Sequence, residues 1–290
     1  MIKTIKYFFE AFFLYLFFIV AKLLGLSISR KFFAFFFQKI GPIIRKKDIA
    51  EKNLNIFSNH LTDEEKEKIK SNMWSNYGMT FIEYIFLNKF RKEQAHINIK
   101  GIKILDEIFK SNKPVIFISG HFANFELMSM ELVKKKISLA TIYRPLNNFF
   151  LNFFMEYVRK TYVCKNQIKK GLVGVKEAIN YIKNNTSIAL MIDQRVSEGK
   201  RLPFFDHMAF TTTLPSQLAL KFNLDIVPIY IVRKENDNFE MEIYEPIKIQ
   251  NKKDSETNKL DISIKLNKIL EKMISKNPGQ WIWTHNRWKR

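Results

Sequence analysis

Cysteine is nearly absent from this sequence of 290 residues, which contains only Cys164. A single cysteine excludes an intrachain disulfide framework and a cysteine-based zinc site, and it suits a protein on the cytoplasmic side of a membrane. Pro/Gly/Ser-rich linkers are missing as well, so the length predicts one large α/β domain with an N-terminal appendage. No Gly-x-Ser-x-Gly elbow and no phosphate loop ending in Gly-Lys-Ser/Thr occurs, which argues against serine-hydrolase and P-loop chemistry.

Acidic residues are few beside the basic ones, with 28 Asp and Glu against 48 Lys and Arg and a net charge of +20. Such an excess indicates an acidic partner, which is a nucleic acid, an anionic membrane surface, or an acidic or phosphorylated substrate. The 28 phenylalanines favour lipid among these. Since the cations are dispersed and no nucleic-acid-binding motif occurs, no nucleic-acid partner is predicted.

The N-terminal appendage is predicted as a membrane-anchor helix over residues 1–30, ahead of a domain over residues 31–290. Residues 7–28 are interrupted only by Glu10 and Lys22 and would form a helix about 33 Å long, just enough to span a bilayer. The uninterrupted apolar core covers only residues 11–21, so an in-plane anchor and a buried helix stay open as alternatives. Lysines and arginines are denser after this segment than before it, which places the body of the protein in the cytoplasm.

Aromatic residues cluster at two further places, residues 32–37 and the tryptophan-rich residues 281–288. The first cluster is expected on the same membrane face, with the core as an equal alternative. The second combines tryptophans with cations, which suits a headgroup interface, and a core-packed tail is the alternative.

Short apolar strands alternate with helices through the rest of the chain. The predicted strands cover residues 97–99, 115–119, 139–143, 187–192, 225–233 and 239–244. The predicted helices cover residues 102–109, 149–161, 173–183 and 255–276, and another begins near residue 214 after a Pro-Phe-Phe loop. This alternation predicts an α/β fold with a central mixed, mainly parallel sheet flanked by helices, in which the last two strands form an antiparallel hairpin.

The stretch VIFISGHFANFELMSM, residues 115–130, carries the clearest chemistry. Gly120 ends an apolar strand, and helical spacing begins near His121, where open α/β sheets place their sites. If His121 lies in the turn and Glu126 one turn into the helix, the carboxylate can accept from one ring nitrogen and leave the other as a base. The alternative is a core histidine behind a strand.

Spacing alone does not decide this, because His60 also has an acid five residues on, Glu65. His60 precedes a capped, charged helix, so a solvated loop histidine is the better interpretation there. Other candidates lie near expected strand and helix ends, where a surface charge or a turn cap is the alternative for each. They are Arg144, Arg159, Asp193 and Gln194.

Taken together, these motifs resemble those of the bacterial lipid A biosynthesis acyltransferases, the late type that adds secondary lauroyl or myristoyl chains. The resemblance covers nearly the whole chain and rests on HFANFE at residues 121–126, Tyr-Arg-Pro at 143–145, Arg159, Asp-Gln at 193–194, Pro-Phe-Phe at 203–205, Thr-Thr-Thr at 211–213 and Gln-Trp-x-Trp-x-His at 280–285. It implies a glycerolipid-acyltransferase-like fold at the inner membrane, with the catalytic domain on the cytoplasmic side. One departure is Asn286, where that family usually has a basic residue.

The activity that the resemblance implies is transfer of a fatty acyl chain from an acyl carrier protein thioester to a hydroxyl of a lipid A precursor, without metal, cofactor or covalent acyl-enzyme. The implied catalytic residues are His121 as base, Glu126 as its orienting partner, and Arg159 and Asp193. The candidates for substrate binding are Arg144, Asn124 and Gln194. Chain length and acyl position depend on pocket depth, which the sequence does not show.

Two alternatives belong to other classes. A glycerophospholipid or lysophospholipid O-acyltransferase would share the fold and a motif similar to HFANFE, the box of residues 121–126. The acid-Gly-x-Arg block of that group is missing here. A non-catalytic basic module bound to membrane phospholipid would bind in a salt-sensitive way and would not need His121.

The two histidines of identical spacing provide a test. His121→Ala and Glu126→Ala should each lower acyl transfer by about a hundredfold or more, as loss of a base or of its orienting group does. His60→Ala is the matched control and should leave the rate unchanged. Equal losses in the His60 and His121 variants, measured in an acyl-transfer assay, would refute the assignment.

Overall fold

The computed structural model describes residues 2–44, 47–196, 198–249 and 255–289. In this part of the chain, seven strands form one sheet in the order β1-β9-β8-β2-β5-β3-β4. Their bounds are Ile97–Lys100 (β1), Ile116–Ser119 (β2), Leu139–Tyr143 (β3), Asn166–Lys169 (β4), Ser187–Met191 (β5), Ile226–Arg233 (β8) and Phe239–Ile243 (β9). Each neighbouring pair is parallel except β8 and β9. The predicted mixed, mainly parallel sheet and its antiparallel last pair are confirmed, whereas β4 was not predicted.

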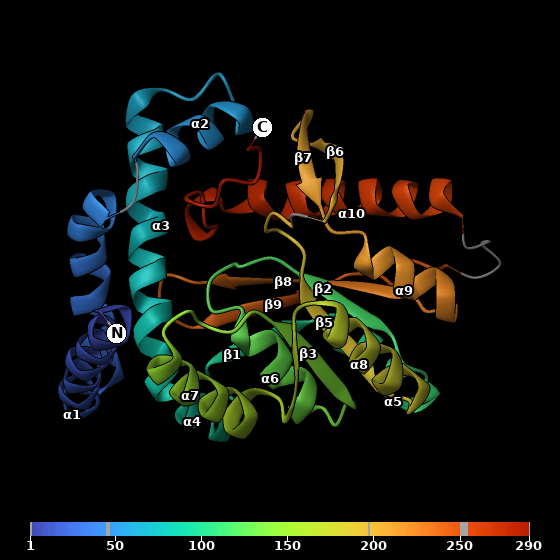
Figure 1. Ribbon diagram of the computed structural model, residues 1–290, viewed down its shortest axis with the longest axis horizontal. Coiled ribbons are helices and arrows are strands. Elements are labelled where there is room, and N and C mark those ends of the chain that lie inside the picture. The colour runs from blue at the N-terminus through green and yellow to red at the C-terminus, as the bar shows by residue number, and fades with distance from the viewer. Residues whose placement is uncertain (1, 45–46, 197, 250–254, 290) are drawn as a thin grey trace.

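Helices cover both faces of this sheet, as Figure 1 shows with α9 and α10 on one side and α4, α6 and α7 on the other. Their bounds are Ile2–Ile44 (α1), Lys47–Phe57 (α2), Asp63–Glu83 (α3), Leu87–Lys92 (α4), Ile102–Ser111 (α5), Glu126–Lys134 (α6), Phe149–Val158 (α7), Leu172–Lys183 (α8), Leu214–Phe222 (α9) and Glu256–Lys276 (α10). Central strand β2 serves both layers, because Ile116 and Ile118 pack in the core under α8 to α10 while Phe117 packs in the core under α4 to α6. This alternation with period two is what a strand covered on both faces requires.

The segment around Pro203 differs from the loop that was predicted. It forms an antiparallel hairpin of β6 (Lys200–Phe204) and β7 (His207–Thr211) that lies against α10. Phe205 and Asp206 make the turn with φ of 49° and 57°. Positive φ at both central residues is typical of a hairpin turn, but glycine or asparagine usually marks it. The turn was missed because neither residue is present here.

The N-terminal helix α1 is bent, although residues 7–28 were predicted as one helix. Gly25 has φ 78° and ψ 170°, which breaks the helix into two parts, and a residue with a β-carbon would be strained there. The second part packs along α3. In the aromatic cluster of residues 32–37, Phe33 is buried at 6 % exposure while Phe35 is 60 % exposed, so the cluster faces both the core and the outside.

A buried ion cluster fixes α1 to the rest of the protein. Glu83 at the end of α3 is fully buried and binds the guanidinium groups of Arg30 in α1 and Arg233 in β8. The Nδ2 of Asn124 donates to the same carboxylate at 2.8 Å. Burial raises the pKa of Glu83, but the two arginines outweigh it and the net pKa is lowered. One carboxylate therefore connects the N-terminal helix, the sheet and the turn after β2.

The tryptophan-rich tail is part of the core, so the predicted headgroup interface is wrong. Trp281 and Trp283 are buried at 1 % and 0 % exposure. Arg287 is also fully buried, where it donates to the main-chain oxygen of Ile192 at 2.9 Å and to Asn267 Oδ1 at 2.8 Å. Burial lowers the pKa of Arg287 to about 10. Tryptophans beside cations occur both at membrane headgroup interfaces and in protein cores. The sequence does not show which groups neutralise a buried cation, so it did not distinguish the two.

Replacing the buried acid should destabilise the fold. Glu83→Gln keeps the shape of the side chain but leaves two buried guanidinium groups without their counter-charge, so the free energy of unfolding should fall by about 3–5 kcal/mol. Glu240→Gln is the control, because Glu240 pairs with Lys100 and Lys234 at the surface and should cost less than about 1 kcal/mol. Denaturant unfolding of both variants measures the difference, and equal losses would contradict the account.

Candidate active site

The register of two parallel strands brings His121 and Asp193 together. Ser119 at the end of β2 lies opposite Met191 at the end of β5, and each candidate follows its strand end by two residues. His121 Nδ1 lies 2.7 Å from Asp193 Oδ1, and the His121 main-chain N–H donates to Oδ2 at 2.8 Å. Asp193 thus positions both the backbone and the ring of His121.

Asp193 is buried at 2 % exposure and also accepts from the indole Nε1–H of Trp281 at 2.9 Å. Burial raises its pKa, but the His121 charge and these hydrogen bonds prevail and hold the pKa of the carboxyl well below its usual range. An ionised carboxylate only accepts, so the proton of this pair belongs to His121 Nδ1. In the neutral form of the ring, Nε2 is then the unprotonated nitrogen, as a general base requires.

The expected hydrogen bond from His121 to Glu126 is not formed, and this part of the prediction is wrong. Glu126 is the first residue of α6 rather than one turn into it, because the chain between His121 and Glu126 is not helical. Its Oε1 instead accepts from Arg159 Nε at 2.8 Å and from Tyr84 OH at 2.7 Å. Burial lowers the pKa of Arg159, but the charge of Glu126 outweighs it and the pKa is raised.

Hydrogen bonds with α3 and with the C-terminal tail fix the turn of residues 121–126. Ala123 has φ 42°, which a residue other than glycine rarely adopts. Its main-chain oxygen accepts from Thr80 Oγ1 at 2.9 Å, and its N–H donates to the oxygen of Gln280 at 3.2 Å. Asn124 is 1 % exposed and points to Glu83, outside the cavity lining, so its position does not fit the predicted substrate contact.

A cavity of about 830 Å³ opens beside this pair at the carboxyl ends of the parallel strands. The predicted residues that line it are His121, Glu126, Arg144, Arg159 and Gln194. Gln194 Nε2 lies 3.5 Å from His121 Nε2, and Arg144 forms no ion pair or hydrogen bond with another described residue. The structure therefore gathers all the predicted site residues except Asn124 around one cavity, with Asp193 directly behind His121.

Comparison with known proteins now decides the family. Residues 2–290 match the family profile described as bacterial lipid A biosynthesis acyltransferase. The chain belongs to this family. It is an acyltransferase of lipid A biosynthesis, and the expected resemblance is confirmed.

Relatives of this acyltransferase are distant in sequence. The lipid A biosynthesis palmitoleoyltransferase of Escherichia coli is 24 % identical over 261 residues, covering 84 % of this chain and 79 % of its own length. The lauroyltransferase of the same organism is 21 % identical over 255 residues, with coverage of 84 % and 79 %. A solved 1-acyl-sn-glycerophosphate acyltransferase from Thermotoga maritima aligns over 89 % of this chain and 100 % of its own, with a TM-score of 0.41 and 15 % identity.

Three residues of the acyltransferase site were not predicted. Tyr84 and Trp281 bond to the acids described above, and His285 lines the cavity, where its Nε2 accepts from the Arg195 N–H at 2.7 Å. Burial lowers the pKa of His285. The signal for Trp281 and His285 was the Gln-Trp-x-Trp-x-His motif, which was recognised but not assigned to the site. The sequence gives no signal for Tyr84, because it is one of several aromatic residues in the mostly apolar residues 73–90.

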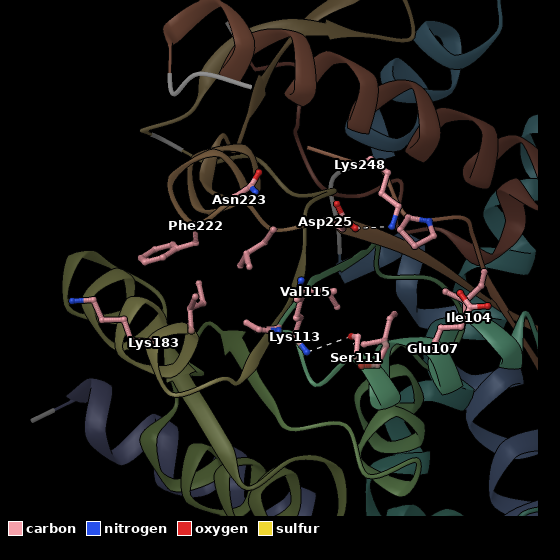
Figure 2. A pocket seen from close by; sticks show the side chains of 15 residues that line it. Ile104, Glu107, Ser111, Lys113, Val115, Lys183, Phe222, Asn223, Asp225 and Lys248 are labelled. Atoms are coloured by element: carbon pink, nitrogen blue, oxygen red, sulfur yellow. Dashed lines mark hydrogen bonds and ion pairs between the residues drawn. The ribbon is translucent and has the colours of Figure 1, made fainter. Parts of the chain in front are cut away.

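A second hollow, of about 660 Å³, lies at the amino ends of strands β2 and β8 (Figure 2). Val115 precedes β2 there and Asp225 precedes β8, and the acid pairs with Lys248 at 2.9 Å. No residue of the box reaches this hollow. Within the described ranges, no group of three or more His, Cys, Asp or Glu side chains is arranged to hold a metal ion. The cavity beside His121 is therefore the site that the chemistry favours.

Asp193 should make stability depend on pH in the acid range. Because its native pKa is depressed, the unfolded carboxyl, with an ordinary pKa of about 4, takes up a proton first as pH falls. The stability that Asp193 contributes is therefore complete above about pH 4 and declines by about 1.4 kcal/mol per pH unit below it. In denaturant unfolding, the free energy of unfolding of wild type should exceed that of Asp193→Asn by less at about pH 3 than at about pH 6. An equal difference at both pH values would contradict this.

Proposed function

We propose that this acyltransferase moves a fatty acyl chain from the thioester of an acyl carrier protein to a hydroxyl of a lipid A precursor, with His121 as general base. The observation that supports it most is the bond from His121 Nδ1 to the buried Asp193 carboxylate, because it leaves Nε2 free at the cavity. The net charge of +20 suits both an acidic carrier protein and a phosphorylated lipid.

The reaction proceeds without a covalent enzyme intermediate in this proposal. His121 Nε2 takes the proton of the acceptor hydroxyl while the oxygen attacks the thioester carbonyl carbon. Asp193 stabilises the imidazolium that forms. The tetrahedral intermediate then collapses, the carbon–sulfur bond breaks, and the imidazolium returns the proton to the leaving thiolate. One ester is formed and one carrier thiol is released.

The other polar groups of the cavity divide into two roles. Gln194 lies beside Nε2, so its amide is placed to donate to the oxygen of the reacting carbonyl. Arg144 has no hydrogen bond or ion pair with another residue in the described part of the chain, and its guanidinium suits a phosphate of the acceptor. Arg159 is already paired with Glu126, so the two act together on one wall of the cavity, and we assign Glu126 to positioning Arg159 rather than His121.

Membrane attachment is assigned to α1, which is long and apolar enough to reach across a bilayer. The denser lysines and arginines after residue 28 favour the inner membrane with the catalytic domain on the cytoplasmic side. Membership of the lipid A family over nearly the whole chain favours this function over glycerophospholipid acylation and over a non-catalytic module.

The decisive test is mass spectrometry of lipid A from cells with and without the gene. Restoring the wild-type gene should add the mass of one acyl chain, which also reports the donor length. Asp193→Asn should leave this species reduced by about a hundredfold or more, because the ring loses the partner that sets its tautomer. His60→Ala should restore it fully. Unchanged lipid A with a glycerophospholipid of altered acyl composition would overturn the proposal in favour of the other acyltransferase class.

A further inference from the structure

The first part of α1 is docked lengthwise on the catalytic domain. The main-chain oxygen of Tyr7 accepts from Asn148 Nδ2 at 2.9 Å, the Tyr15 hydroxyl donates to the oxygen of Phe150 at 2.8 Å, and Lys22 Nζ donates to the oxygen of Ile85 at 2.6 Å. Residues 7 to 22 of a helix cover about 22 Å. Most of the segment that is apolar enough to cross a membrane thus lies alongside the body of the enzyme.

The outward side of this helix is apolar. Ala11 and Phe18 face the body and are buried at 3 % and 8 % exposure. On the opposite side a stripe of helical spacing is about half exposed: Phe9, Phe13, Phe17 and Val20. An exposed apolar face of this length marks a contact with lipid or protein, and its composition passes the length and hydropathy test for a membrane segment.

Helix α7 continues the same apolar surface. Phe150 packs on Phe8 of α1 with ring centroids 5.7 Å apart, and the ring of its neighbour Phe149 contacts it in a tilted arrangement with centroids 4.1 Å apart. Phe149, Phe153 and Tyr157 recur every four residues and are 44 %, 74 % and 61 % exposed. One stripe of α7 therefore binds α1 and the next is largely exposed, so that the apolar surface extends from α1 onto the catalytic domain.

We infer that the first part of α1 lies in the plane of one leaflet, with α7 beside it, and does not cross the bilayer. The inference rests on the proposed function only in placing the chain at a membrane. If the helix crossed, the docked body would enter the hydrocarbon core over about three quarters of the roughly 30 Å thickness of that core. That body includes Glu156 of α7 in an ion pair with the exposed Lys169, and charges in hydrocarbon are strongly disfavoured. In the plane, the apolar stripes are immersed and these charges stay in water.

This orientation brings the wall of the cavity that contacts α7 close to the membrane surface. Tyr143 lines the cavity, and its hydroxyl donates to Glu156 Oε1 of α7 at 2.6 Å. A lipid acceptor can therefore reach His121 from the leaflet in which α7 rests, without leaving the membrane.

Cysteine labelling tests the orientation without reference to activity. Cys164 is buried and so is shielded from the reagent, and single further cysteines are placed at the exposed Lys3 in α1 and at the exposed Lys110 in α5. A membrane-impermeant maleimide is applied to inverted membrane vesicles and to spheroplasts from cells expressing the full chain. Lys3→Cys should be labelled in the same preparation as Lys110→Cys and not in the other. Labelling of the two positions in opposite preparations, or no labelling of Lys3→Cys in the preparation that labels Lys110→Cys, would overturn the inference.

Depth measurement tests the contribution of α7. A bimane label on Phe153→Cys, in phospholipid vesicles that contain lipids spin-labelled high in the acyl chain, should lose at least about half of its fluorescence through contact with the quencher. Phe109→Cys in α5 is the matched control, because Phe109 is 52 % exposed on another helix, and it should not be quenched. No quenching at Phe153→Cys would exclude α7 from the membrane surface, and equal quenching at both positions would contradict the orientation inferred here. If the labelling and quenching results are as predicted but the wild-type protein shows no acyl transfer to lipid A, only the proposed function is contradicted.

Discussion

The site depends on one buried carboxylate. Asp193 accepts from the ring and the main-chain N–H of His121 and from the indole of Trp281, and it fixes three segments that are distant in sequence. These bonds lower its pKa against the effect of burial, so it stays ionised and sets the tautomer of the histidine. The parallel pairing of β2 with β5 and the buried tail are needed because they bring these donors to one point.

A second buried carboxylate, Glu83, connects the anchor with the catalytic turn. It binds Arg30 of α1 on one side and Asn124 of the box on the other. Because Arg30 lies at the predicted boundary between anchor and domain, this contact crosses that boundary. A buried ion cluster permits little displacement of its members. Glu83 therefore links the second part of α1 directly to the turn that carries His121.

Much of this could be predicted from sequence because the signals are local. Strand and helix periodicity predicted the sheet, and their places at predicted strand ends made His121, Arg144 and Asp193 candidates for one site. The partner of His121 could not be predicted, because it depends on the register between β2 and β5, and the short box made Glu126 look like the nearer acid. Trp281 and Arg287 were misjudged for a related reason. Their burial depends on acceptors that other segments supply, such as Asp193 and the oxygen of Ile192.

Nitrogen-15 NMR of the histidine rings would test the central claim most directly, with His121 assigned by its absence in His121→Gln. The account predicts that Nδ1 carries the proton and Nε2 does not, and that the strongly hydrogen-bonded Nδ1 proton is lost in Asp193→Asn but kept in Glu126→Gln. A proton on Nε2, or loss of the Nδ1 signal in Glu126→Gln with its retention in Asp193→Asn, would contradict it.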